Sequence, residues 1–206
     1  MSNTPDFRLD MVAEANFPSD FGQFRIFGFE GHFAQSTRKE ECLALVMGAL
    51  DGDPPLVRIH SQCLTGDVLH SLRCDCRAQL TTALDAISEA GRGLLIYEHQ
   101  EGRGIGLMNK LRAYQLQDNG RDTVQANEDL GFAADLRSFI MPAEILRYFG
   151  LTAVRFLSNN PQKIAALESA GIRVTERVPI QIETLASTAD YLRTKKEKLG
   201  HLLKGF

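Results

Sequence analysis

Short apolar runs recur along the chain and predict the strands of a sheet. In residues 22–29 apolar and polar side chains alternate, which is the period of a half-buried strand. Four further runs are compact, apolar and bounded by turn residues: 56–60, 94–97, 153–157 and 172–178. Residues 41–47 fit a helix or a strand, and residues 30–40 are polar enough for a loop. We therefore expect a sheet at the centre of the fold.

Helical spacing marks the segments between these runs. A helix is predicted over residues 78–90, where apolar residues recur every three or four positions, and Gly91 is suited to end it. Asn160 is a good N-cap for another helix, with Pro161 in its first turn. Further helices are predicted over 107–118, 142–149 and 188–203.

Strands that alternate with helices favour an α/β fold, which we expect to be a layered α/β/α-type domain with a mixed sheet. The chain has no repeat, no low-complexity tract and no long Gly/Ser linker. We therefore predict one domain over residues 1–206, with residues 1–15 as a flexible arm.

Composition narrows the classes of protein that fit. The chain has 206 residues, of which 44% are apolar and 24% charged, and this suits a globular protein with a sizeable core. Its formal net charge of −3 argues against nucleic-acid binding through a broad basic surface. No apolar run approaches the roughly 20 residues of a membrane span, and the N-terminus lacks an apolar signal segment. We expect a cytoplasmic protein that binds neither nucleic acid nor membrane, and a phosphate ligand would need a local basic pocket.

The densest candidate chemistry lies in residues 58–79, which hold three of the four cysteines in the spacing C-x10-C-x-C. These three are Cys63, Cys74 and Cys76. The fourth, Cys42, lies in an apolar run typical of a core. Clustered cysteines of a reduced compartment more often bind metal or do chemistry, and three thiolates on zinc leave one position for water, as in a catalytic site. Two alternatives stay open: structural zinc with His60 or His70 as a fourth ligand, and inert thiols.

A second candidate site is the glycine-rich stretch, residues 98–106, between a predicted strand and a predicted helix. Three alternating glycines, beginning at Gly102, let the backbone approach a ligand, and a helix N-terminus attracts anions. Arg103 adds donors suited to phosphate, whereas Glu101 would serve a base edge or a metal-bound cation. The spacing matches neither the dinucleotide fingerprint nor the P-loop, so a tight strand-to-helix turn is the alternative.

Other basic side chains are predicted to be solvated. Lys110 and Arg112 follow the glycine-rich stretch and on their own indicate only an exposed helix face. Lys195, Lys196 and Lys198 belong to the basic, amphipathic C-terminal helix, and we expect them to face solvent as well.

Seven motifs carry a resemblance to a known family. One of them is Ser71-Leu-Arg-Cys-Asp-Cys76. The chain resembles GTP cyclohydrolase II in residues 58–67, 71–76, 100–107, 109–114, 122–127, 131–137 and 159–163. The resemblance extends over residues 15–205, so it implies a GTP cyclohydrolase II-like fold for nearly the whole chain. It also implies the stand-alone form, without the dihydroxybutanone phosphate domain of fused versions.

The resemblance implies a reaction as well as a fold. The family opens the imidazole ring of GTP, releases the ring carbon as formate and removes pyrophosphate. The product is a diaminopyrimidinone ribosyl phosphate, which starts riboflavin synthesis. The resemblance further implies one catalytic zinc ion per subunit on Cys63, Cys74 and Cys76, Mg²⁺ with the triphosphate, and a homodimer.

The same resemblance assigns roles to individual residues. Tyr114 matches the tyrosine of the ring-opening step, Asp135 the proton acceptor, and Arg137 the proposed nucleophile for the α-phosphate. Because a guanidinium stays protonated at neutral pH, Arg137 also fits charge stabilisation of the phosphoryl group. The positions expected to contact GTP are Arg58, Ile59, His60, Ser61, Gln62, Gln79, Glu101, Gly102, Arg103, Thr123, Ser158 and Lys163.

Four positions depart from the residues usual in the family. Gln62 stands where Glu is usual, Arg77 where Gly is, His99 where Arg is, and Ser158 where Thr is. Two other functions compete with the leading one. A paralogue would make the same or a formylated pyrimidine for a specialised metabolite, although Tyr114 favours complete deformylation. A zinc-stabilised regulator would bind the nucleotide without turnover and would not need the full catalytic set.

Overall fold

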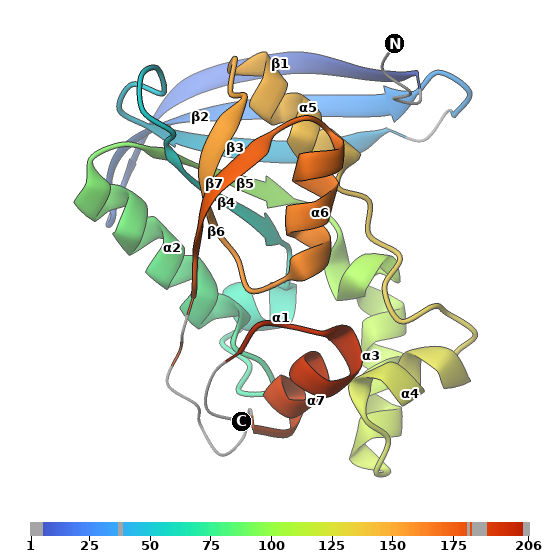
Figure 1. Ribbon diagram of the computed structural model, residues 1–206. Coiled ribbons are helices and arrows are strands. Elements are labelled where there is room, and N and C mark those ends of the chain that lie inside the picture. The colour runs from blue at the N-terminus through green and yellow to red at the C-terminus, as the bar shows by residue number, and fades with distance from the viewer. Residues whose placement is uncertain (1–5, 37–38, 181, 183–188, 204–206) are drawn as a thin grey trace.

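The computed structural model describes residues 6–36, 39–180, 182 and 189–203. Its centre is a seven-stranded sheet with the strand order β1-β2-β3-β5-β4-β6-β7 (Figure 1). The strands are β1 (Phe7–Ser19), β2 (Gly22–Phe33), β3 (Glu40–Met47), β4 (Leu56–Ser61), β5 (Gly93–Glu98), β6 (Ala153–Leu157) and β7 (Arg173–Val178). The five predicted strands are confirmed as β2, β4, β5, β6 and β7, and the residues left open between helix and strand lie in β3.

The N-terminal half of the sheet is antiparallel: β1 pairs with β2, β2 with β3 and β3 with β5. This corrects the expected arm over residues 1–15. Residues 1–5 lie outside the described part, but from Phe7 onward the chain is strand, because its backbone pairs with β2 as far as Ser19. The loop expected over residues 30–40 is also shorter, because β2 continues to Phe33 and β3 begins at Glu40.

The C-terminal half of the sheet is parallel: β4 pairs with β5 and β6, and β6 pairs with β7. Parallel strands end at the same edge of a sheet, and ligands bind beyond that edge in open α/β folds. The chain leaves this edge after Ser61, Glu98 and Leu157. The backbone N–H of Gln62 donates to the carbonyl of Glu98 (2.9 Å), which extends the contact between β4 and β5 beyond the strands. The cysteine-containing and glycine-rich stretches therefore begin side by side.

Helices cover both faces of the sheet, which confirms the layered α/β/α expectation (Figure 1). The helices are α1 (Leu64–Asp67), α2 (Cys76–Ala90), α3 (Leu107–Asp118), α4 (Thr123–Asp129), α5 (Ile140–Tyr148), α6 (Pro161–Ser169) and α7 (Ala189–Leu199), and a 3₁₀ turn, η1, spans Glu101–Gly104. Alternation along β5 separates two cores: Leu94 and Ile96 pack with α5 and α6, whereas Leu95 packs with α2.

Local sequence signals set several helix ends. Gly91 ends α2 in the left-handed region (φ 65°), and the Asn160 side chain caps α6 by accepting from the backbone N–H of Gln162 (2.9 Å), as predicted. α4 is missing from the predicted helices, although a capping box between Asp122 and Gln125 begins it. The C-terminal helix runs from Ala189 to Leu199, and Thr188, where we expected it to begin, lies outside the described residues.

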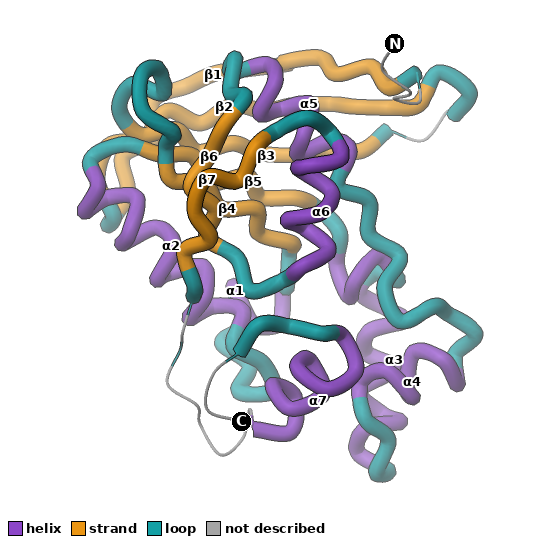
Figure 2. The backbone as a smooth tube through the Cα atoms, viewed as in Figure 1, coloured by secondary structure: helices purple, strands orange, loops and turns teal. Residues whose placement is uncertain are grey.

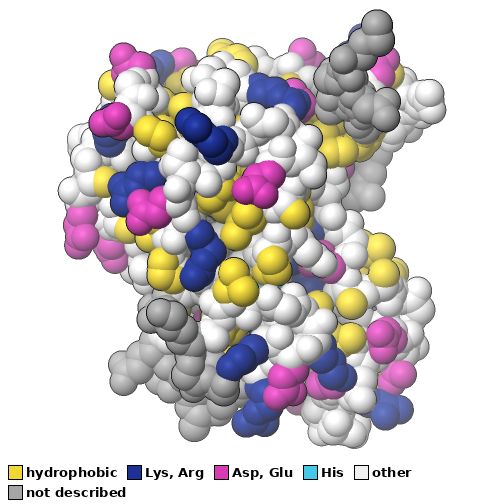
Figure 3. All heavy atoms as spheres, in the orientation of Figure 1, with side chains coloured by type: hydrophobic (Ala, Val, Ile, Leu, Met, Phe, Trp, Pro, Cys, Tyr) yellow, Lys and Arg dark blue, Asp and Glu magenta, His cyan; other side chains and the backbone are white. Residues whose placement is uncertain are grey.

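Helices α3, α4 and α7 gather beyond the strand ends and form the lower part of the molecule in Figure 2. On the face shown in Figure 3, Lys and Arg side chains are interspersed with Asp and Glu side chains and do not form one broad patch. Within the described ranges, no helix combines the length and the apolar character needed to cross a membrane.

Candidate active site

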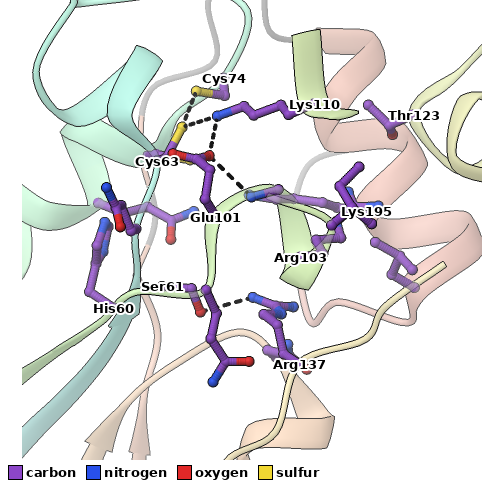
Figure 4. Close-up of a pocket in the computed structure, with 18 of the residues that line it drawn as sticks. His60, Ser61, Cys63, Cys74, Glu101, Arg103, Lys110, Thr123, Arg137 and Lys195 are labelled. Carbon is purple, nitrogen blue, oxygen red and sulfur yellow. Dashed lines mark hydrogen bonds and ion pairs between the residues drawn. The ribbon is translucent and has the colours of Figure 1, made fainter. Parts of the chain in front are cut away.

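A pocket opens at the shared edge of the parallel strands, beside helices α3, α4 and α7. In the close-up of Figure 4, Cys63, Cys74, Lys110 and Glu101 point toward one another at one side of this pocket. Among the described residues that line it, one is acidic, Glu101, and seven are Lys or Arg. These seven are Arg58, Arg73, Arg103, Lys110, Arg137, Lys163 and Lys195. A local basic pocket therefore exists in a chain whose net charge is −3.

Cys63, Cys74 and Cys76 form a three-thiol cluster whose sulfur atoms all lie within 4.8 Å of one another. The Sγ atoms of Cys63 and Cys74 are 3.7 Å apart. Two thiolates bound tetrahedrally to zinc would be separated by about 3.8 Å. Gly66 keeps the cluster open, because a Cβ there would lie 2.8 Å from Sγ of Cys74 and 3.1 Å from Sγ of Cys63. The free thiols and the space that Gly66 leaves them suit a zinc site.

Neither candidate histidine joins the three-thiol cluster. Nε2 of His60 lies 3.2 Å from both carboxylate oxygens of Asp67, and His70 contacts Arg77. Within the described residues, no further His, Cys, Asp or Glu belongs to the cluster. The geometry thus gives no support to structural zinc with His60 or His70 as fourth ligand. Three protein ligands leave one coordination position open.

Lys110 is buried, which corrects the expectation of a solvated side chain. Its Nζ lies 3.0 Å from Sγ of Cys63 and donates to Oε1 of Glu101 at 2.7 Å. The inward direction follows from helical spacing, because Tyr114 lies one turn further along α3 and lines the same pocket. Hydrogen bonding with Cys74, helped by the charge of Lys110, holds the pKa of Cys63 well below its usual range. Lys110 therefore places a positive charge against the thiolate of Cys63.

Glu101 joins the glycine-rich stretch to the turn that carries Cys63. Its side chain is buried, and Oε2 accepts a hydrogen bond from the backbone N–H of Leu64 at 2.7 Å. Oε1 forms the ion pair with Lys110. Glu101 therefore has protein partners for both carboxylate oxygens, and these partners account for a negative charge within the glycine-rich stretch.

The backbone of the glycine-rich stretch is a tight turn, η1, with left-handed conformations at Gly102 (φ 62°) and Arg103 (φ 60°). Gly104 lies against Leu136, where a Cβ would be 3.1 Å from the backbone. The carbonyl of Arg103 accepts from the N–H of Leu136 at 3.0 Å. The tight-turn alternative therefore describes the backbone correctly, and the same turn places Arg103 in the pocket lining.

A buried polar cluster lies where β4 and β5 end. Nζ of Lys163 donates to Oγ of Ser61 at 2.9 Å and to the carbonyl of Ile59 at 3.0 Å, and it lies 3.4 Å from Oε1 of Glu98. Nη1 of Arg137 also donates to Oγ of Ser61, at 3.1 Å. Burial, opposed by Glu98 and reinforced by nearby guanidinium groups, lowers the pKa of Lys163 to about 7. Its charge therefore changes near neutral pH.

Asp135 holds Arg137 in place. Nε of Arg137 donates to Oδ1 of Asp135 at 2.9 Å, and the backbone N–H of Arg137 donates to the same oxygen at 3.1 Å. Burial alone would raise the pKa of Asp135, but the hydrogen bonds and charge of Arg137 lower it overall. The two side chains thus form a partly buried, oriented ion pair with the guanidinium on the pocket side.

Arg58 is buried at the inner wall of the pocket. Nη2 donates to Oε1 of Gln79 at 2.8 Å, and Nη1 donates to the carbonyl of Leu157 at 3.0 Å. Burial lowers the pKa of Arg58 to about 10, so the guanidinium keeps its proton at neutral pH. The amide of Gln79 in turn donates to Oδ2 of Asp75 at 2.5 Å.

Two hydroxyl groups face the pocket from the helices. The hydroxyl of Tyr114 lies 3.1 Å from that of Thr65, and the guanidinium carbon of Arg73 lies 4.8 Å from the centre of the Tyr114 ring. Oγ1 of Thr123 is buried and has no hydrogen-bond partner among the described residues. Since Thr123 lines the pocket, a bound ligand can satisfy this hydroxyl.

The structure brings nearly all the predicted site residues together, although their roles stay predictions. All of them line the pocket except Ile59 and Asp135. Ile59 is fully buried and offers only its carbonyl, to Lys163, whereas Asp135 acts on the pocket through Arg137.

Several lining residues are missing from the predicted set. Eight of them lie inside the motifs of the resemblance, so those motifs contained the signal: Arg73, Gln100, Ile105, Lys110, Ala113, Asn127, Asn159 and Asn160. Outside the motifs lie Gln117, Lys195, Leu199 and His201. The last three come from the C-terminal region, where no motif pointed to a site.

The expected solvated face of the C-terminal helix is also corrected. Lys195 is 8% exposed and donates to Oδ1 of Asp75 at 2.8 Å. Lys198 is more exposed and pairs with Asp122. The expectation fails for Lys195 because α7 packs over the pocket, and its Leu192 is only 3% exposed, whereas Lys198 is exposed as expected.

The four departures from the family's usual residues occupy different surroundings. Gln62 and Ser158 line the pocket, and Oγ of Ser158 accepts from the backbone N–H of Asn160 at 3.1 Å. Arg77 is exposed, contacts His70 and is not among the lining residues. His99 is also exposed. Of the two departures beside the cysteines, Gln62 therefore reaches the pocket and Arg77 does not.

Comparisons with known proteins give consistent matches. A profile described as GTP cyclohydrolase II matches residues 10–179. GTP cyclohydrolase-2 of Histophilus somni (strain 2336) is 54% identical over 197 residues, which is 95% of this chain and 89% of that protein. The proteins of the same name from Haemophilus influenzae (strain PittEE) and Pasteurella multocida (strain Pm70) are 50% and 51% identical, over 95% of this chain and 90% and 89% of theirs.

Among solved structures, RibBX, a two-domain 3,4-dihydroxy-2-butanone 4-phosphate synthase from A. baumannii, aligns with a TM-score of 0.48 and 16% identity. The alignment covers 88% of this chain and 42% of that one.

Adding a methyl group at Gly66 should weaken metal binding. In Gly66→Ala the new Cβ would overlap Sγ of Cys74, so we expect the apparent zinc affinity to fall about tenfold or more. Competition with a chromogenic chelator measures this. Gly28→Ala is the matched control, because a Cβ there meets only a backbone oxygen, at 4.0 Å. Equal zinc affinity of the two variants would contradict the assigned role of Gly66.

Removing the Lys110 cation should destabilise the protein and weaken its binding of zinc. Lys110→Met leaves Glu101 buried without its ion-pair partner, and breaking a buried pair costs about 3–5 kcal/mol. Urea unfolding of the zinc-loaded protein measures the free energy of unfolding. Arg112→Met, on the exposed side of the same helix, should change it by less than about 1 kcal/mol. A similar small loss for both variants would show that the Lys110 pair is not needed.

Proposed function

This chain belongs to the GTP cyclohydrolase II family, and on that premise we propose that it is a zinc-dependent hydrolase acting on GTP. It opens the imidazole ring, releases formate and pyrophosphate, and leaves a diaminopyrimidinone ribosyl phosphate, the first step of riboflavin biosynthesis. One observation carries the proposal: the three-thiol cluster shares its pocket with seven Lys and Arg side chains. Such a pocket can hold a metal and a triphosphate at once.

The three-thiol cluster would hold the zinc ion, which supplies Lewis acidity and activates water at neutral pH. Gly66 leaves room for the ion, and Lys110 orients Cys63 through its contact with Sγ. Glu101 fixes Lys110 and the backbone at Leu64 together, so the cysteine turn keeps its position when substrate enters. Tyr114 presents its hydroxyl beside this cluster, which supports its predicted part in ring opening.

The cations on the opposite side suit the triphosphate. Arg137 and Lys163 both donate to Ser61, and Arg58 lies behind them, so three positive charges converge near the ends of the strands. Phosphate oxygens would replace Ser61 as acceptors and strengthen these contacts. Mg²⁺ accompanies the triphosphate in this proposal, because a metal ion neutralises charge on the leaving pyrophosphate.

We assign Arg137 to charge stabilisation of the phosphoryl group. Its guanidinium is held by Asp135 on one side and donates to Ser61 on the other, an arrangement that favours the protonated form. A protonated guanidinium is a good donor and a poor nucleophile. Asp135 orients Arg137 in this assignment and accepts a proton only when phosphate binding weakens the pair.

The remaining predicted positions surround the nucleotide. Thr123 offers its unpaired hydroxyl, Arg103 its guanidinium, and Gln79 the amide that also contacts Arg58. We propose that His60 supports Asp67, which accepts from the backbone N–H of Cys63 at 3.0 Å. Ile59 contributes its carbonyl to Lys163, and Gln62, Gly102 and Ser158 complete the wall.

We further propose a homodimer in the cytoplasm, with residues 1–206 acting as one domain. Free thiols at the cluster need a reducing compartment to bind metal. One sheet includes strands from both ends of the chain, which supports a single domain. The edge strand β1 exposes Met11, Val12 and Phe17, and a second subunit would cover such apolar side chains.

The test of the proposed function is a product analysis. Zinc-loaded protein incubated with GTP and Mg²⁺ should release formate and pyrophosphate and yield the diaminopyrimidinone monophosphate, as followed by mass spectrometry and a formate assay. A product that keeps the formyl group would favour the paralogue, and unchanged but bound GTP would favour the regulator. Arg137→Lys separates the two views of Arg137: pyrophosphate release within about tenfold of wild type would rule out an obligatory guanidinium–phosphate bond.

Binding of the triphosphate should weaken as the pH rises through neutrality. Burial lowers the pKa of Lys163 to about 7, so its ammonium group is present below that pH and lost above it. A charge-assisted hydrogen bond contributes about 1.5–3 kcal/mol, so the affinity should fall about tenfold between pH 6 and pH 8.5. Titration calorimetry with a non-hydrolysable GTP analogue measures the trend.

Lys163→Met is the control for this pH dependence, because methionine has a similar length and no proton to lose. The variant should bind the analogue weakly at every pH, which also corrects for ionisation of the phosphates themselves. An unchanged pH dependence in Lys163→Met would show that another group causes the trend.

A further inference from the structure

The C-terminal helix α7 forms one wall of the pocket. Lys195, Leu199 and His201 all line it, although 120 positions separate Lys195 from Asp75 in the sequence. Figure 4 shows Lys195 among the side chains that line the pocket. The backbone N–H of Leu202 donates to the carbonyl of Asn159 at 2.9 Å, which fixes the end of this segment to the turn after β6. The helix is therefore attached to the site by more than one contact.

The most deeply buried of these contacts reaches the metal-binding loop. Nζ of Lys195 donates to Oδ1 of Asp75 at 2.8 Å, and the two side chains are only 10% and 5% exposed. Asp75 lies between Cys74 and Cys76 in the sequence, so its carboxylate position and the direction of both thiols depend on the same backbone. Lys195 thus compensates a buried negative charge in the middle of the three-thiol cluster's own loop.

The second carboxylate oxygen of Asp75 continues the network into the substrate side. Oδ2 accepts from the amide of Gln79 at 2.5 Å, and Oε1 of Gln79 accepts from Arg58 at 2.8 Å. The amide of Gln79 is oriented because its nitrogen must face Asp75 and its oxygen must face Arg58. The contacts therefore run from Lys195 of α7 to Asp75 of the cysteine loop, then to Gln79 of α2, and end at Arg58 of β4.

We infer that Lys195 is a positioning residue, which fixes Asp75 and thereby both the Cys74–Cys76 loop and the Gln79–Arg58 pair. This inference rests on the proposed function for its kinetic consequence, but its effect on the metal does not depend on turnover. Without Lys195 the carboxylate of Asp75 remains buried and uncompensated, which favours a loop that opens to water. The C-terminal helix is then a required part of the active site.

The experiment compares Lys195→Met with Lys198→Met in the full zinc-loaded chain. Lys198 is on the same helix, but its pair with Asp122 is more exposed and should contribute little. We expect Lys195→Met to lose zinc to a chelator tenfold to a hundredfold faster than wild type, with kcat/KM for GTP reduced by a similar factor. Lys198→Met should stay within about twofold of wild type in both measurements.

Two further variants distinguish positioning from general destabilisation. Lys195→Arg keeps the cation and should recover most of the zinc retention. Asp75→Asn combined with Lys195→Met removes the orphaned charge, so it should hold zinc better than Lys195→Met alone, a non-additive result typical of a direct pair. Circular dichroism identifies any variant that has not folded.

Zinc retention in Lys195→Met equal to that in Lys198→Met would overturn the inference, and so would a double variant that holds zinc no better than Lys195→Met alone. The proposed function is tested separately by formate release from the wild type. Absence of formate would overturn that function, while the chelator measurement would still decide the role of Lys195.

Discussion

The parallel pairing of β4 with β5 is the constraint on which the site depends. It brings Ser61 opposite Glu98 in register, and the N–H of Gln62 extends the contact to the carbonyl of Glu98. The chain then diverges into the cysteine turn from one strand and the glycine-rich stretch from the other. Glu101 reconnects them by accepting from Leu64 and pairing with Lys110. Backbone pairing and these side-chain contacts therefore fix the three-thiol cluster and the glycine-rich stretch relative to each other.

Charge compensation is the second principle of the site. The pocket lining carries an excess of cations, and buried cations are costly without partners. Each of the cations discussed is therefore held by an oriented acceptor: Lys110 by Glu101, Arg137 by Asp135, Lys195 by Asp75 and Lys163 by Ser61 and a backbone carbonyl. Lys163 is compensated least well, since Glu98 lies 3.4 Å away, and its pKa accordingly falls to about 7. The charge of Lys163 thus responds to pH near neutrality.

Two glycines leave space that a larger side chain would fill. Gly66 leaves the three-thiol cluster open on one side, and Gly104 lets the glycine-rich stretch lie against the segment that carries Arg137. The C-terminal helix then adds Lys195 and Leu199 to the pocket lining, so a segment from the far end of the chain contributes to a site whose cysteines are local in sequence.

The sequence by itself determined the elements that depend on short-range patterns. Short apolar runs, one of them alternating with polar residues, predicted five strands. Asn160 predicted its helix cap, and the spacing of Cys63, Cys74 and Cys76 predicted a metal site, because each signal is contained in about ten to twenty residues. The motifs of the resemblance extended this to most of the pocket lining. Burial and pairing across long separations were decided only by the tertiary structure. Lys110 and Lys195 look like solvated charges in sequence, and become buried partners because α3 and α7 pack over strand ends and a loop that lie far away along the chain. The sequence gives the charge of a side chain, but folding decides whether that side chain is desolvated and which residue it pairs with.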